Sequence, residues 1–206
     1  MISFVYFDVG GVMMSDFSGT NKWELMKRDI GITPEKDKEF DQFWDKYEKE
    51  AHVGRDIDTL IPLITKKFHV DFPIGYSLLT DFLNRFESNE SIWPVVSRVR
   101  QNCQIGLLTN MYPRMLSAMT KKDLIPSISW DIIIDSSIEG CQKPDKNIFQ
   151  IAEQKINIEK DNILFVDNTA VNVNAAKDFG WQTFLYDSSN HKNSSRKLLD
   201  YYESII

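Results

Sequence analysis

The residues best suited to chemistry in this sequence come directly after short runs of apolar residues. Asp8 follows one such run, Thr109 and Asn110 follow a second, and Asp167 and Asn168 follow a third. If these runs are strands of an open parallel sheet, their carboxyl ends meet at the edge where ligands bind. We therefore expect two carboxylates, a hydroxyl and two amides to converge at that edge.

Two carboxylates held together favour a hard divalent cation, because the cation offsets their repulsion. Magnesium usually takes one or two carboxylates together with substrate phosphate. A carboxylate at such a site can attack phosphorus as a covalent nucleophile, while Lys143 of the segment Lys143-Pro144-Asp145 spreads the charge of the transferring group. Taken singly, each segment also fits a turn or a helix cap. Their joint occurrence favours a site for phosphoryl transfer.

Five short runs rich in β-branched and aromatic residues predict buried strands. They span residues 2–7, 105–108, 132–134, 163–166 and 183–186. Helical periodicity separates the later runs, and alternation of strand and helix implies right-handed crossovers. The pattern predicts an α/β fold with a Rossmann-like parallel sheet core and helices on both faces.

The long interval between the first two strands contains helical patterns and no convincing strand. Aromatic residues recur there at helical spacing, as at Phe40, Phe43, Trp44 and Tyr47. Mutual packing explains this spacing better than an aromatic cofactor site does. We predict a helical cap domain at residues 15–94, inserted into a catalytic core formed by residues 1–14 and 95–206.

In this order, the segments FDVGG, LLTN, KPD and FVDNTAVNVNAAKDFGW resemble the four motifs of the haloacid dehalogenase-like superfamily. The resemblance spans the whole chain and includes the helical cap inserted after the first motif. The FDxGG opening is similar to that of sugar-phosphate phosphatases and of the N-terminal phosphatase domains of epoxide hydrolases. The resemblance implies that Asp8 is the nucleophile, that Lys143 steadies it and the phosphoryl oxygens, and that Thr109 and Asn110 bind phosphate.

The same resemblance implies a magnesium ion bound by Asp8, the Gly10 carbonyl, Asp167 and Asn168. An acid is common in the family where this chain has Asn168, so we expect magnesium to bind weakly, in the millimolar range. The implied activity is hydrolysis of a small phosphorylated metabolite, such as a sugar phosphate or an acyl phosphate, through an aspartyl-phosphate intermediate at Asp8.

Gly10 departs from the family pattern, because most phosphatases of the family carry a second aspartate at that position. This aspartate acts as a general acid, a role typically worth about 10²- to 10⁴-fold in rate. Two hypotheses follow. The substrate is an activated phosphate, such as an acyl phosphate or a sugar 1-phosphate, or another acid such as Asp16 replaces the missing one.

Two other functions compete with the phosphatase hypothesis. A metal-independent 2-haloacid dehalogenase uses the same nucleophile, but typically has an aromatic residue two positions later and lacks the metal-binding aspartate. Gly10 and Asp167 therefore argue against it. A non-catalytic binding protein of the same fold is compatible with Gly10 and Asn168, whereas the presence of Asp8 and Lys143 argues against that alternative.

Composition limits the kinds of partner. The 206 residues carry a formal net charge of -6, which argues against binding to nucleic acid or to an anionic membrane. Neither a signal peptide nor an apolar run of membrane-spanning length is expected. Cys103 and Cys141 have no metal-binding spacing, so we expect a reducing, cytoplasmic location. The three histidines, His52, His69 and His191, are expected at the surface or with their ring nitrogens hydrogen-bonded. The sequence contains no signal for the oligomeric state.

Overall fold

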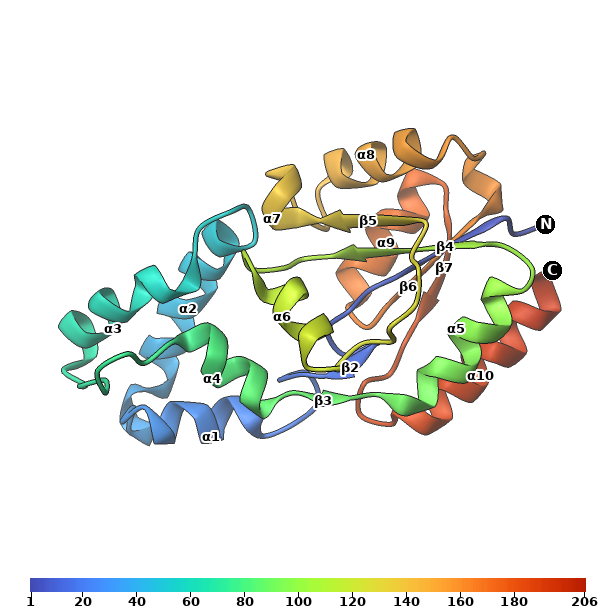
Figure 1. Ribbon diagram of the computed structural model, residues 1–206. Coiled ribbons are helices and arrows are strands. Elements are labelled where there is room, and N and C mark those ends of the chain that lie inside the picture. Colours follow the sequence, from blue (N-terminus) through green and yellow to red (C-terminus); the bar gives the residue numbers. More distant parts are fainter.

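The computed structural model describes residues 1–206 and has a five-stranded parallel sheet at its centre (Figure 1). The strand order is β5-β4-β1-β6-β7. The strands are β1 (Phe4–Phe7), β4 (Gln104–Thr109), β5 (Ile132–Asp135), β6 (Ile163–Asp167) and β7 (Gln182–Leu185). All five predicted strands are present, and each end lies within two residues of its expected position.

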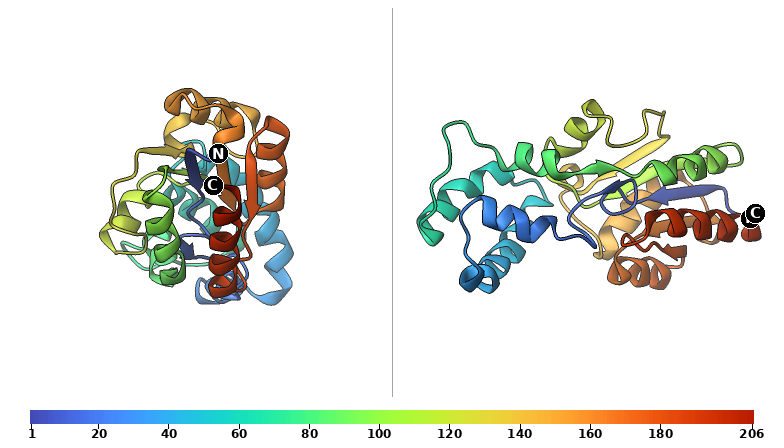
Figure 2. Two further views of the ribbon diagram at one scale, coloured as in Figure 1. Left: turned by 90° about the vertical axis from the view of Figure 1, so that its right-hand side faces the viewer. Right: turned by 90° about the horizontal axis from the view of Figure 1, so that it is seen from below.

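Helices cover both faces of this sheet, as the sequence predicts. They are α5 (Trp93–Arg100), α6 (Met115–Lys121), α7 (Ser136–Glu139), α8 (Lys146–Ile156), α9 (Ala170–Phe179) and α10 (His191–Ile205). Figure 2 shows the sheet between helical layers when the molecule is viewed from its end. No helix in the structure has both the length and the apolar character needed to cross a bilayer.

The side chains of β1 alternate between two hydrophobic clusters. Val5 and Phe7 belong to the cluster that includes residues of α5, α6 and α10. Phe4 and Tyr6 belong to the cluster that includes residues of α8 and α9. Full burial of a large apolar side chain contributes roughly 1.5–3 kcal/mol, so the two clusters hold the central strand firmly between the helical layers. The result is the expected Rossmann-like α/β core.

A separate group of helices forms the inserted domain between β1 and β4. It contains α1 (Lys22–Asp29), α2 (Asp37–Ala51), α3 (Ile61–Phe68) and α4 (Leu78–Arg85), with short 3-10 turns at Pro34–Lys36 and Ile57–Leu60. Aromatic contacts hold these helices together: Trp44 lies 5.2 Å from Trp23 and 5.3 Å from Phe82 between ring centroids. Phe40, Phe43 and Trp44 are buried, in agreement with the packing role expected for them.

A two-stranded antiparallel ribbon connects the inserted domain to the core. Its strands are β2 (Met14–Ser15) and β3 (Glu87–Ser88). The ribbon was not predicted, because a two-residue strand carries no detectable periodicity. Buried Asn89 anchors it by donating hydrogen bonds to the Val12 carbonyl and the Tyr186 hydroxyl, at 2.7 and 2.9 Å. These two strands lie at the start and near the end of the segment predicted as the cap, residues 15–94.

Candidate active site

Two buried carboxylates joined by one lysine form the floor of the candidate site. Asp8 follows β1 and Asp167 ends the neighbouring β6, so the parallel register brings both to one edge of the sheet. Lys143 Nζ lies 2.8 Å from Asp8 Oδ1 and 2.6 Å from Asp167 Oδ2. It also donates to the Leu108 carbonyl at 2.9 Å, so all three ammonium protons have acceptors. We call Asp8, Lys143 and Asp167 the charged floor.

Burial and mutual charge set the proton affinities of the charged floor. Burial by itself lowers the pKa of Lys143, but Asp167 and Asp8 outweigh this effect and hold the pKa above its usual value. The pKa of Asp8 is raised to about 7, because burial outweighs the Lys143 charge and the Asp167 charge adds to the rise. Two carboxylates with one ammonium leave a surplus of negative charge when ionised. A further cation would therefore favour ionised Asp8.

Asn110 holds the segment that carries Lys143. Its side-chain Nδ2 donates to the Lys143 carbonyl at 2.9 Å, and its Oδ1 accepts from the Lys143 backbone N–H at 2.8 Å. Both ends of the side-chain amide are thus engaged within the protein. Asn110 also lines the pocket, so its contact with phosphate stays a prediction. Thr109 is only 1% exposed and is not among the residues that line the pocket. Its hydroxyl makes one long hydrogen bond, 3.4 Å, to the Asn110 carbonyl.

The start of α9 organises the Asp167 side of the floor. The Thr169 backbone N–H donates to Asp167 Oδ1 at 2.7 Å, and Asn172 Nδ2 lies 3.3 and 3.2 Å from the two carboxylate oxygens. Asn172 was not identified from the sequence, although its position five residues after Asp167, in the first turn of a helix, is a usable signal. Asn168 lines the pocket, and its Nδ2 donates to Ser188 Oγ at 3.2 Å.

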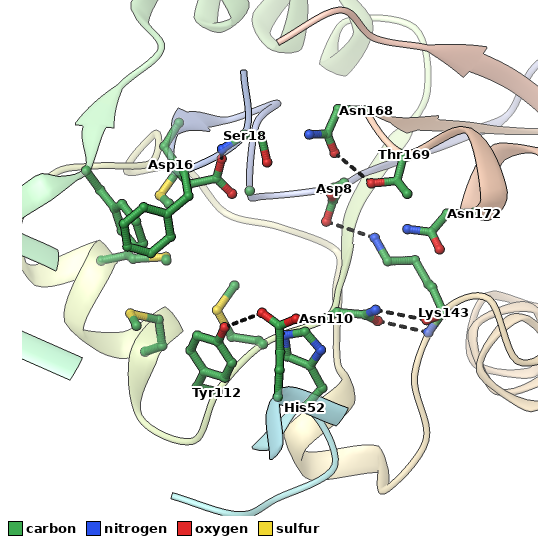
Figure 3. Close-up of a pocket in the computed structure, with 18 residues that line it drawn as sticks. Asp8, Asp16, Ser18, His52, Asn110, Tyr112, Lys143, Asn168, Thr169 and Asn172 are labelled. Carbon is green, nitrogen blue, oxygen red and sulfur yellow. Dashed lines mark hydrogen bonds and ion pairs between the residues drawn. The ribbon is translucent and has the colours of Figure 1, made fainter. Parts of the chain in front are cut away.

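A pocket of about 330 Å³ opens above the charged floor. Its apolar lining consists of methionine and aromatic side chains: Met14, Phe17, Phe86, Met111, Tyr112, Met115 and Met119. Methionine is flexible and polarizable, so this lining adapts to differently shaped groups. Figure 3 shows the labelled residues around the pocket, with Asp8 and Lys143 across from Tyr112 and His52.

Glu48, His52 and Tyr112 form the wall opposite the charged floor, which we call the cap wall. Glu48 and His52 belong to α2 and its C-terminal end, whereas Tyr112 follows β4. The Tyr112 hydroxyl donates to Glu48 Oε1 at 2.7 Å, and the His52 ring stacks on Tyr112 with centroids 5.0 Å apart. His52 Nδ1 lies 3.1 Å from Gln142 Oε1. His52 is hydrogen-bonded, as expected, but it also lines the pocket, a position that the sequence did not reveal.

Gly10 and Asp16 both line the pocket near Asp8. Gly10 contributes no side chain, so the position where the resembled family pattern has an aspartate is bare here. Asp16 follows β2 and accepts a hydrogen bond from the Ser18 backbone N–H at 2.7 Å. Burial raises the pKa of Asp16 above its usual value.

The donors around the charged floor fit magnesium. They are oxygen donors: the carboxylates of Asp8 and Asp167, with the Gly10 backbone and the Asn168 side chain beside them at the pocket surface. The structure contains no group of three or more His, Cys, Asp or Glu side chains arranged to hold a metal. Magnesium needs no such group, because one or two carboxylates, neutral oxygens and substrate phosphate complete its ligands. The surplus negative charge of the charged floor also favours binding of a cation.

Solved structures with the same fold include several hydrolases. A predicted HAD-like family hydrolase from Porphyromonas gingivalis is 20% identical, with a TM-score of 0.74 and coverage of 97% of this chain and 98% of that one. A HAD family enzyme from Bacteroides thetaiotaomicron, in complex with magnesium and inorganic phosphate, is 14% identical, with a TM-score of 0.71 over 91% of this chain and 96% of that one. An L-2-haloacid dehalogenase from Xanthobacter autotrophicus is 18% identical, with a TM-score of 0.63 over 90% of this chain and 78% of that one. At these identities the likeness concerns the fold.

Comparison of the sequence with known proteins assigns the chain to a family. A 93-residue stretch is 28% identical to acyl-CoA dehydrogenase family member 10 of Mus musculus, and this stretch is 45% of our chain but only 8% of that protein. The chain therefore matches a small part of this curated relative. The family model for haloacid dehalogenase-like hydrolases matches residues 7–180, which include the whole charged floor and the inserted helices. The chain belongs to the haloacid dehalogenase-like hydrolase family.

Proposed function

We propose that this hydrolase is a magnesium-dependent phosphatase that acts on a small phosphorylated metabolite through an aspartyl-phosphate intermediate at Asp8. The charged floor is the observation that carries the proposal. Asp8 lies at the base of the pocket with one carboxylate oxygen paired to Lys143 at 2.8 Å. The other oxygen is left to attack phosphorus, as a nucleophilic carboxylate does in covalent catalysis.

Each member of the floor has a distinct part in this reaction. Lys143 holds Asp8 in place and neutralises charge on the phosphoryl oxygens. Magnesium, bound by Asp8, the Gly10 carbonyl, Asp167 and Asn168, would supply the positive charge that a phosphoryl dianion needs beside two carboxylates. Thr109 is the proposed hydroxyl donor to phosphate. Asn110 acts through the Lys143 segment, because both ends of its amide bind that backbone.

The pocket favours small leaving groups that carry no second negative charge. Its volume of about 330 Å³ is at the lower end of the range for small-molecule sites. The methionine and aromatic lining suits the carbon skeleton of a metabolite. Glu48 faces the same space from the cap wall, so a further carboxylate or phosphate on the substrate would be repelled.

The charged floor also favours phosphatase activity over dehalogenase activity. Both chemistries use an aspartate nucleophile, and an L-2-haloacid dehalogenase is among the structures that share the fold. Displacement of halide from carbon requires no neutralisation of a transferred dianion. A second buried carboxylate at Asp167, bound to the same lysine at 2.6 Å, therefore supports a metal-assisted reaction on phosphate.

One set of assays distinguishes these activities. Wild-type protein and Asp8→Asn are incubated with 4-nitrophenyl phosphate and with 2-chloropropionate, in millimolar magnesium and in chelator. We expect phosphate release by the wild type in magnesium, little in chelator, and none above background for Asp8→Asn. Asp187→Asn is the matched control, because Asp187 is exposed and does not line the pocket.

Other outcomes would contradict the proposal in different ways. Release of chloride in chelator would identify a dehalogenase. Absence of both activities over a panel of phosphorylated metabolites would support a binding protein. Full phosphatase activity after dialysis against chelator would contradict the weak magnesium binding expected from Asn168.

A further inference from the structure

The carboxylate of Asp16 is held in one orientation at the edge of the pocket. Its Oδ1 accepts the Ser18 backbone N–H at 2.7 Å. Its neighbour Phe17 packs between Phe82 and Phe86 of the inserted domain, with ring centroids 4.9 and 5.3 Å away. The loop that follows β2 is therefore held by the hydrogen bond to the Asp16 carboxylate and by the packing of the Phe17 ring. Figure 3 shows the Asp16 carboxylate on the same side of the pocket as Asp8.

The second oxygen of Asp16 occupies the space that a side chain at position 10 would fill. A Cβ atom added to Gly10 would lie 2.5 Å from Asp16 Oδ2, which is far inside van der Waals contact. The backbone of Gly10 does not itself require glycine, since its φ is not positive. A side chain at position 10 would therefore displace the carboxylate of Asp16 from its present place.

Glu48 and Lys143 have partners elsewhere in the pocket. Glu48 Oε1 accepts hydrogen bonds from Tyr112 and Trp44 on the opposite wall, at 2.7 and 3.2 Å. Lys143 is bound to both carboxylates of the charged floor. Asp16, by contrast, forms no ion pair, and its side-chain hydrogen bonds to other residues are to Ser18 alone, whose backbone N–H donates to Oδ1. Asp16 is thus a pocket carboxylate that is paired with no lysine or arginine and lies on the same side of the pocket as Asp8.

We propose that Asp16 is the general acid and base of the phosphatase reaction, a role that rests on the proposed function. As Asp8 bonds to phosphorus and the bond from phosphorus to the leaving oxygen breaks, the Asp16 carboxyl gives its proton to that oxygen and the alcohol departs. Water then attacks the phosphorus of the aspartyl phosphate and gives a proton to the Asp16 carboxylate. Inorganic phosphate leaves, and both aspartates return to their starting forms.

A series of leaving groups tests this role. Asp16→Asn preserves the acceptor for Ser18 and removes the transferable proton. For an alkyl phosphate we expect kcat/KM, which reports formation of the aspartyl phosphate, to fall by about 10²- to 10⁴-fold, the usual contribution of a general acid. For 4-nitrophenyl phosphate, whose leaving group needs little protonation, the fall in kcat/KM should be several-fold at most. The value of kcat/KM should therefore depend steeply on leaving-group pKa in the variant and weakly in the wild type. The value of kcat should fall for both substrates, because the water that attacks the aspartyl phosphate has lost its base.

Moving the carboxylate provides a second, independent test. In Gly10→Asp/Asp16→Ala, the side chain that blocks position 10 is gone and an acid stands in its place. We expect this double variant to recover a substantial part of the alkyl phosphatase activity that Asp16→Ala alone loses. Asp187→Asn again serves as the control for loss of a nearby carboxylate outside the pocket. Thermal unfolding of each variant shows whether it remains folded.

Several results would overturn the role of Asp16. An equal loss of kcat/KM for alkyl and nitrophenyl phosphates would mean that Asp16 only positions other groups. Unchanged activity in Asp16→Asn, or no recovery in a folded double variant, would also exclude it. These results leave phosphate release dependent on Asp8 and so leave the phosphatase proposal intact. Absence of Asp8-dependent phosphate release in the wild type would overturn both proposals together.

Discussion

The two sides of the pocket differ in how firmly their side chains are held. On the charged floor, the Lys143 side chain is 1% exposed and the Asp8 side chain 10%. On the cap wall, the Glu48 side chain is 34% exposed and the His52 side chain 16%. The floor lies at the ends of two central strands, whereas the cap wall joins an inserted helix to a loop of the core.

This difference separates reaction chemistry from substrate choice. Removing one partner from a buried ion pair leaves an uncompensated charge and is costly, whereas exposed pairs contribute little. The floor should therefore tolerate almost no substitution. Changes on the cap wall should alter which leaving group is accepted and leave the chemical step largely intact.

The largest effect is expected from Lys143→Met, which replaces the buried ammonium by a neutral chain of similar length. The two carboxylates then face each other without their shared partner, so we expect a loss of roughly 3–5 kcal/mol in the free energy of unfolding. Turnover should fall by at least about 10²- to 10³-fold. Urea unfolding and phosphate release measure the two quantities. Lys146→Met, at an exposed position on α8, should change neither, and a similar effect in both variants would contradict the distinct role of the floor.

A pH dependence of stability is the next largest effect, measured on protein freed of metal by chelator. Asp8 has a pKa of about 7 in the folded protein against an ordinary value of 3.8. Asp8 therefore holds its proton more tightly in the folded state than in the unfolded state. The stability that this difference contributes is complete below about pH 4 and is lost as pH rises to about 7. The loss is roughly 1.4 kcal/mol per pKa unit at most. The stability of the wild type relative to Asp8→Asn should fall over that interval in urea titrations. Parallel curves would refute a raised pKa for Asp8.

The charged floor could be predicted because the ends of buried strands can be located from runs of apolar residues. Apolar runs locate β1 and β6, and parallel pairing then brings Asp8 and Asp167 to one edge without further information. The orientation of Asp16 depends on the two-residue ribbon β2 and β3, which has no periodic signal, so Asp16 could be suggested but not placed. The hydrogen bonds between the Asn110 amide and the Lys143 backbone arise only from tertiary packing, so no local sequence signal indicates them.

The cap wall was beyond prediction for a related reason. The helical pattern of α2 identifies Trp44 as buried, and Glu48 lies one turn further along the same face. Whether that face also meets the pocket depends on how the inserted domain docks on the core. The hydrogen bond from Tyr112 to Glu48, between residues 64 positions apart, is a product of this docking and has no local sequence signature.

The smallest effect is expected on the cap wall itself, from Glu48→Gln. The amide keeps an acceptor for the Tyr112 hydroxyl but removes the negative charge that faces the substrate. We expect KM for substrates with a second anionic group to fall by about tenfold, which corresponds to roughly 1.4 kcal/mol, while KM for neutral leaving groups and kcat for both stay within a few-fold. Glu50→Gln, on the same helix but paired with Arg55 outside the pocket, is the matched control. A fall in kcat of the size expected for Lys143→Met would mean that the cap wall takes part in the chemical step, and the division between the two sides of the pocket would be wrong.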